Sequence, residues 1–114
     1  MRKIFKTHEF LEFMNNSETN VKDKVDYLFD IITTQPVINS KVAKKLINTA
    51  FYEVRIQVNN EYRIIVFAID HDNITQSKNI LFLNGFMKKS TKDYDKQIKI
   101  AIKILDQWKD RNLI

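Results

Sequence analysis

Hydrophobic residues in the first third of the chain recur at helical spacing. Residues 8–15 predict a short helix with one apolar side, and a second stripe predicts a longer helix after an N-cap at Ser17. The stripe consists of Val21, Val25, Leu28, Phe29 and Ile32. Pro36 ends this helix, because the residue before a proline avoids the α region. With a short strand over residues 2–6, these elements predict a helical hairpin that packs on a sheet.

The middle of the chain changes to strand patterns. Residues 52–58 alternate: apolar side chains occupy one face, and Glu53, Arg55 and Gln57 occupy the other, which predicts a strand with one face in water. Asn59-Asn60 predicts a tight two-residue turn. Residues 62–69 and 79–87 are apolar on both faces, as in central strands, and a polar loop over 70–78 joins them. We predict an antiparallel three-strand meander, with a further short strand over residues 42–46.

The last predicted element is an amphipathic helix over residues 94–109. Its apolar side carries Tyr94, Ile98, Ala101, Ile102, Leu105 and Trp108. Lysines, among them Lys92, line the opposite side, where a row of charge is typical of a solvated face. The pattern as a whole predicts one α+β domain over residues 1–114. Its antiparallel sheet packs on the N-terminal helical hairpin, and the amphipathic helix follows.

Composition narrows the class of protein. Apolar residues make up 44% and charged residues 29% of the 114-residue chain, which is typical of a folded globular domain. The absence of cysteine excludes disulfide partners and thiolate metal sites. No apolar run reaches the length of a membrane span, and the N-terminus lacks an export signal, so we expect a cytoplasmic protein. The net charge of +5 favours polyanions or acidic proteins as partners.

Basic residues are predicted to gather near one end of the sheet. Arg63 starts an otherwise apolar strand, where a guanidinium needs a partner or a place at the rim. With a two-residue turn, Val58 would oppose Glu61 and Arg55 would lie near Ile64, within reach of Arg63. Lys88 and Lys89 follow the last strand. Such a cluster suits phosphate. The alternative is a structural role, in which Arg63 pairs with Glu53 or Glu61.

Three other residues invite a chemical interpretation. Gly85 is the only glycine, and it marks either a bulge or close backbone approach, or simply the geometry of a strand end. His71 lies between two aspartates, but consecutive side chains in a loop do not converge on a metal ion, so we expect it in solvent. His8 is expected at the surface and is only a weak candidate for proton transfer. The sequence contains no phosphate loop and no dinucleotide fingerprint.

Three segments together resemble the RelE/ParE superfamily, and most closely its HigB-like, phage-derived branch of toxin–antitoxin toxins. They are Phe51-Tyr52-Glu53-Val54-Arg55, Glu61-Tyr62-Arg63-Ile64, and the run from Ile80 to Ser90 that contains Gly85-Phe86-Met87-Lys88-Lys89. The resemblance covers about residues 41–105. It implies a small antiparallel sheet packed on two N-terminal helices.

The resemblance also implies an activity. Many members are mRNA interferases that cut mRNA in the ribosomal A site without metal or cofactor, and a cognate antitoxin neutralises them. Arg55, Arg63 and Lys88 would contact the scissile phosphate and ribosomal RNA, with Lys89 nearby. Tyr94 is a candidate for proton transfer, although its place on the apolar stripe favours packing. We assign Lys44, Lys45 and Lys92 to RNA binding as well.

Two other functions stay open. A ParE-like toxin would inhibit DNA gyrase by binding it, and would have no need for converging phosphate ligands. A non-catalytic phage-derived protein could keep the same fold. The sequence therefore predicts a toxin, with an mRNA endonuclease as the first hypothesis for its activity.

Overall fold

A computed structural model describes residues 1–112. They form five strands, which make one sheet, and three helices. In chain order they are β1 (Lys3–Lys6), α1 (His8–Asn15), α2 (Thr19–Thr34), β2 (Ala43–Lys45), β3 (Phe51–Val58), β4 (Asn60–Ala68), β5 (Asn79–Met87) and α3 (Thr91–Asn112). The predicted α+β class, the antiparallel β3–β4–β5 meander, the helical hairpin and the C-terminal helix are confirmed.

The sheet has five strands in the order β1-β5-β4-β3-β2. β2, β3, β4 and β5 are antiparallel neighbours, but β1 pairs with β5 in the parallel direction, from Lys3 opposite Asn79 to Lys6 opposite Phe82. The prediction of a purely antiparallel sheet was therefore wrong for β1. The pattern of a four-residue strand indicates neither its partner nor its direction, and this partner lies more than half the chain away.

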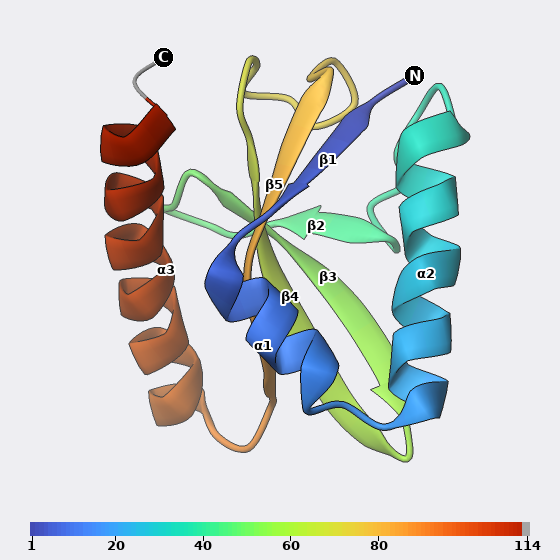
Figure 1. The fold of residues 1–114 in the computed structure, drawn as a ribbon, viewed down its shortest axis with the longest axis vertical. Coiled ribbons are helices and arrows are strands. Elements are labelled where there is room, and N and C mark those ends of the chain that lie inside the picture. The colour runs from blue at the N-terminus through green and yellow to red at the C-terminus, as the bar shows by residue number, and fades with distance from the viewer. Residues whose placement is uncertain (113–114) are drawn as a thin grey trace.

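Helices cover both faces of the sheet (Figure 1). On one face, α1 and α2 bury a core that includes Phe10, Ile32 and Phe82. On the other face, α3 packs on a second core that includes Leu81 and Leu105. The prediction of a wet face on β3 was wrong at Glu53, which is buried and hydrogen-bonded by Tyr94 of α3, and right at Arg55 and Gln57, which are exposed. An alternating pattern reports polarity and cannot show that a distant helix covers the strand.

A side-chain cap is present at the start of α1 and absent at the start of α2. The side chain of Thr7 accepts a hydrogen bond from the Phe10 amide and starts α1. Ser17 does not cap α2 as predicted, because its hydroxyl donates to the Phe13 carbonyl and Glu18 takes the N-cap position. α2 ends at Thr34, before Pro36, as predicted.

The β3–β4 turn is tighter than predicted. Of Asn59 and Asn60, only Asn59 adopts a left-handed backbone, with φ of 65°, and Val58 pairs with Asn60. The predicted register of Val58 opposite Glu61 was therefore wrong by one residue. In the observed register Arg55 lies directly opposite Arg63. Facing residues in a ladder point to the same side of the sheet, so the correction brings the two arginines together.

Arg2 ties the N-terminus to two distant segments. Its guanidinium donates to the carbonyls of Ile32 and Pro36 at the end of α2, and to that of Thr75 in the β4–β5 loop. A cation at a helix C-terminus also interacts favourably with the helix dipole. None of the helices within residues 1–112 is long and apolar enough to cross a membrane.

Candidate functional site

A pocket of about 260 Å³ lies where β2, β3 and β4 meet the beginning of α3. Its lining residues are Lys44, Lys45, Leu46, Ile47, Glu53, Arg55, Arg63, Lys88 and Tyr94. Five of these are cations and one is a carboxylate. All four residues predicted as catalytic line this pocket, as do two of the four lysines predicted to bind RNA.

Glu53 is the buried carboxylate at the centre of the pocket. It is only 3% exposed. Its Oε1 accepts a hydrogen bond from Arg55 Nε at 2.7 Å, and its Oε2 lies 3.7 Å from Arg63 Nε and accepts a hydrogen bond from the Tyr94 hydroxyl. Sequence reasoning treated Glu53 only as a counter-ion for Arg63. A signal was present, because a glutamate flanked by Tyr52 and Val54 on a strand next to an apolar strand must find partners if it is buried.

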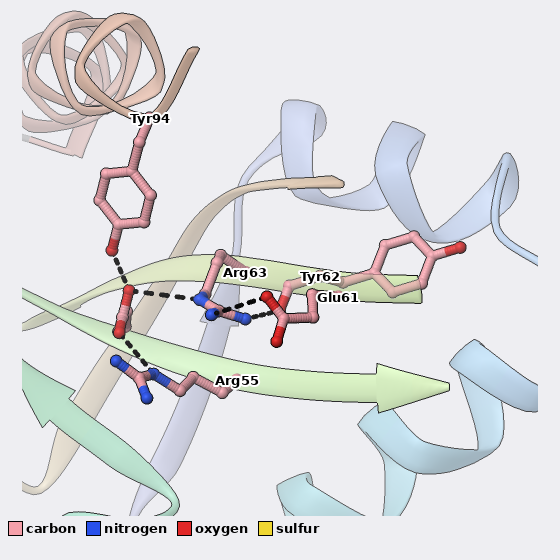
Figure 2. Close-up of polar contacts among 6 residues, drawn as sticks. Arg55, Glu61, Tyr62, Arg63 and Tyr94 are labelled. Atoms are coloured by element: carbon pink, nitrogen blue, oxygen red, sulfur yellow. Dashed lines mark hydrogen bonds and ion pairs between the residues drawn. The ribbon is translucent and has the colours of Figure 1, made fainter. Parts of the chain in front are cut away.

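Arg63 is held by several groups at once. Its side chain is buried, and its Nη2 lies 3.4 Å from Glu61 Oε2 while its Nη1 donates to the Tyr62 carbonyl at 3.2 Å. Figure 2 shows the guanidinium joined by dashed lines to Glu61 and to the backbone of Tyr62, whose ring lies apart from the two arginines. With Glu53 on its other side, Arg63 lies beside both of the carboxylates that the structural alternative offered as partners.

Arg55 presents its guanidinium to solvent. Its side chain is 51% exposed, and the hydrogen bond to Glu53 uses Nε. The two terminal nitrogens point away from the strand (Figure 2). Such a fork matches the geometry of a phosphate oxygen pair. Of the two predicted arginines, Arg55 is therefore the one placed to contact an anion directly.

The lysines of the pocket differ in how they are placed. Lys44 lies opposite Glu53 in the β2–β3 ladder and so shares its face. Lys45 points to the other face, where its Nζ lies 5.4 Å from the centre of the Tyr52 ring and donates to a loop carbonyl. Lys88 follows β5 and is exposed, with its amide bonded to the Glu61 carbonyl.

Tyr94 joins the first turn of α3 to the sheet. Its ring packs edge-on against Phe86, with centroids 5.6 Å apart, and its hydroxyl donates to Glu53. Figure 2 shows the side chain descending from the helix toward the arginines. The packing predicted from the apolar stripe and the proton-transfer role for which Tyr94 is a candidate are both compatible with this position.

Other predicted residues lie elsewhere. Lys89 and Lys92 are exposed around the start of α3 and do not line the pocket. His8 is exposed at the first position of α1, and His71 Nδ1 accepts a hydrogen bond from the Asn73 amide in an exposed loop. Within residues 1–112 no group of acidic or histidine side chains is arranged to hold a metal ion.

The sequence matches the family described as "Phage derived protein Gp49-like (DUF891)" over residues 12–106. The chain belongs to this Gp49-like family. Among curated proteins, none matches the chain. The description of this family as phage-derived agrees with the phage-derived branch that the resemblance indicated.

Solved structures share the fold. A chain of the intact E. coli RelBE toxin–antitoxin complex superposes with a TM-score of 0.61 at 12% identity, covering 79% of this chain and 100% of that chain. A free E. coli toxin RelE with two arginines mutated gives 0.60 at 11% identity, covering 86% and 95%. The isolated E. coli RelE toxin gives 0.54 at 11% identity, covering 87% and 97%. The resemblance to the RelE/ParE superfamily is thus confirmed for the fold.

Proposed function

We propose that this Gp49-like protein is the toxin of a toxin–antitoxin pair and cuts mRNA on the translating ribosome, with the pocket around Glu53 as its active site. The observation that carries the proposal is the meeting of Arg55, Lys44 and Lys88 with the Glu53–Tyr94 pair. Cations placed around one point suit a phosphodiester, and a hydrogen-bonded carboxylate–phenol pair can move protons. The RelE-like fold supports an antitoxin partner, since RelE is found with one in the RelBE complex.

The proposed reaction is an internal transfer at phosphorus. The ribose 2′-oxygen bonds to phosphorus while the bond to the 5′-oxygen breaks, which leaves a 2′,3′-cyclic phosphate and a 5′-hydroxyl. Arg55, Lys44 and Lys88 stabilise the negative charge that builds up on the phosphate oxygens. Glu53 takes the 2′-hydroxyl proton, and Tyr94 donates a proton to the leaving oxygen and regains one through its hydrogen bond to Glu53.

Arg63 has a positioning role in this proposal. Its burial and its two carboxylate partners leave it little freedom to follow a substrate. Its contact with Glu53 Oε2 holds that carboxylate in place, in the way that supporting residues orient a catalytic group. The proposal therefore separates two arginines that the sequence had grouped as equivalent phosphate ligands.

A cell-free translation assay tests the function. Wild-type protein added to translating ribosomes should produce new mRNA 5′ ends that primer extension maps within the translated region, and Arg55→Ala or Lys88→Ala should lower their yield at least about 100-fold. Lys99→Ala, on the exposed side of α3, should cut as well as wild type. Uncut mRNA together with inhibited DNA gyrase supercoiling would favour the ParE-like function, and silence in both assays the non-catalytic one.

The roles of the proton-transfer pair need their own variants. Glu53→Gln keeps the size of the side chain but removes its basicity, and Tyr94→Phe keeps the packing on Phe86 but removes the hydroxyl. We expect each to lower the cleavage rate by about 100-fold or more while the protein stays folded. Full activity of Glu53→Gln would remove the carboxylate from the mechanism.

A further inference from the structure

A second surface lies apart from the cationic pocket, between α1 and α3 along the outer edge of β5. This groove has a volume of about 520 Å³. Its charged lining residues are Glu9, Glu12 and Glu18, with no lysine or arginine among the lining residues. In a chain with a net charge of +5, this local acidity suits a basic partner and repels RNA.

The floor of the groove is an open strand edge. β1 pairs with β5 only as far as Phe82, so no strand within residues 1–112 lies beside the outer edge of β5 beyond that point. The Lys88 amide donates to Glu61 on β4, and antiparallel pairing alternates. Met87 and Gly85, one and three positions before Lys88, therefore turn their amides and carbonyls away from β4. Both residues line the groove.

Asn84 adds an acceptor without a donor. Its side chain is 5% exposed and lines the groove. Its Nδ2 donates to the carbonyl and side-chain oxygen of Gln97 on α3, at 3.3 and 3.1 Å. Because the backbone carbonyl of Gln97 can only accept, the Asn84 amide group faces it, and its buried Oδ1 has no hydrogen-bond partner among the described residues. A buried acceptor left without a donor costs free energy, which a bound partner could recover.

We propose that the Gly85–Met87 edge binds an extended segment of a partner protein that carries a lysine or arginine. The segment adds a strand to β5 through the free backbone groups of Gly85 and Met87, which is the β-augmentation mode of peptide recognition. Its basic side chain reaches Glu9 and Glu12, and a donor on the segment satisfies Asn84 Oδ1. The inference stands without RNA cleavage, because none of these residues lines the cationic pocket.

Random linear peptides displayed on phage are the probe. The full-length protein should enrich peptides in which a lysine or arginine alternates with apolar residues, and a synthetic peptide with the enriched sequence should bind in fluorescence anisotropy. Glu12→Lys should weaken that binding at least about tenfold, whereas Asp23→Lys, an equal charge change on α2, should not. Met87→Pro removes the outward amide without breaking a β4 bond and should also weaken it. Arg55→Ala should bind normally.

Amide exchange separates strand addition from mere adhesion. The peptide should slow exchange of the Gly85 and Met87 amides in the wild-type protein, a readout that does not depend on any variant folding. Failure to enrich basic alternating peptides, or binding that Glu12→Lys leaves unchanged, would overturn the proposal. So would self-association of the protein through this edge, seen as a dimer that Met87→Pro dissociates, since a second copy would then be the occupant.

Discussion

Asp70 organises the loop that joins β4 to β5. Burial by itself raises the pKa of its carboxyl, but hydrogen bonds from the Ser77 hydroxyl and from the Lys78 and Asn79 amides outweigh it and lower the pKa from 3.8 to about 2. The ionised form of Asp70 therefore belongs to the folded loop. The sequence showed this segment only as polar, because the partners of Asp70 lie seven to nine positions away.

Replacing Asp70 by Asn should destabilise the protein by about 1 kcal/mol at pH 7, a modest value because the side chain is exposed. Since the folded pKa lies below the unfolded one, the contribution is present above about pH 4 and is lost as the pH falls toward 2. Urea unfolding at pH 7 and pH 3 should show the difference from wild type shrinking at the lower pH. Asp72→Asn in the same loop is the control, and a difference that grows at low pH would contradict the assignment.

Gly85 leaves room for an aromatic ring. A Cβ at this position would lie 2.5 Å from Cδ2 of Phe13 on α1. Of the interpretations offered by the sequence, close approach is therefore right, although a side chain makes the approach rather than a backbone. Gly85 has no positive φ, and the strand continues through it to Met87.

Gly85→Ala should therefore destabilise the protein by about 1–3 kcal/mol through overpacking. The Phe13 ring cannot simply turn aside, because Phe10 and Tyr62 pack on it with centroids 6.3 Å away. In a Phe13→Ala background the same change should cost much less, which a double-mutant cycle of unfolding free energies would measure. Equal costs in both backgrounds would show that the ring is not the obstacle.

At the scale of elements, the amides on the two sides of β5 should exchange their hydrogens at different rates. The amides of Asn84 and Phe86 face β4 and should exchange slowly, whereas those of Gly85 and Met87 face the groove and should exchange faster. NMR-detected exchange of the free protein gives all four rates. Uniform protection across Asn84–Met87 would mean that the outer edge is already covered, and would remove the basis for a partner strand.

The strands and helices themselves were largely predictable, because their apolar spacing is local. The residues 8–15 and 79–87 match α1 and β5 at both ends. The errors concern pairing over a distance. β1 pairs with a strand that is distant in the sequence, and α3, from the far end of the chain, covers Glu53. In the β3–β4 turn, one residue fewer changes which side chain faces Arg55. None of these long-range contacts can be predicted from the spacing of apolar residues within a single segment.

The candidate site was predictable in its members and not in its arrangement. Arg55, Arg63, Lys88 and Tyr94 line one pocket, although each could equally have pointed elsewhere on the evidence of sequence spacing. What could not be read from the sequence is that Glu53 joins three of them. The contact depends on the position of α3 against β3, which a packing interaction sets and no motif records.

The molecule as a whole separates two surfaces. Tyr62 and Arg63 are neighbours in β4 but point to opposite sides of the sheet, Tyr62 toward the acidic groove and Arg63 toward the cationic pocket. The basic net charge is thus not spread evenly, and an RNA and a basic protein segment could be bound without competing. In our proposals, the pocket serves the reaction and the β5 edge serves a partner.

Cleavage of mRNA by the protein on purified ribosome complexes tests the central claim most directly. With mRNA and a translating ribosome held in a single state, excess wild-type protein should cut the message and leave a 2′,3′-cyclic phosphate on the upstream fragment. Arg55→Ala and Glu53→Gln should each slow this single-turnover step by about 100-fold or more, while Lys99→Ala matches wild type. No cleavage by the wild type, or equal rates for wild type and the two pocket variants, would contradict the account.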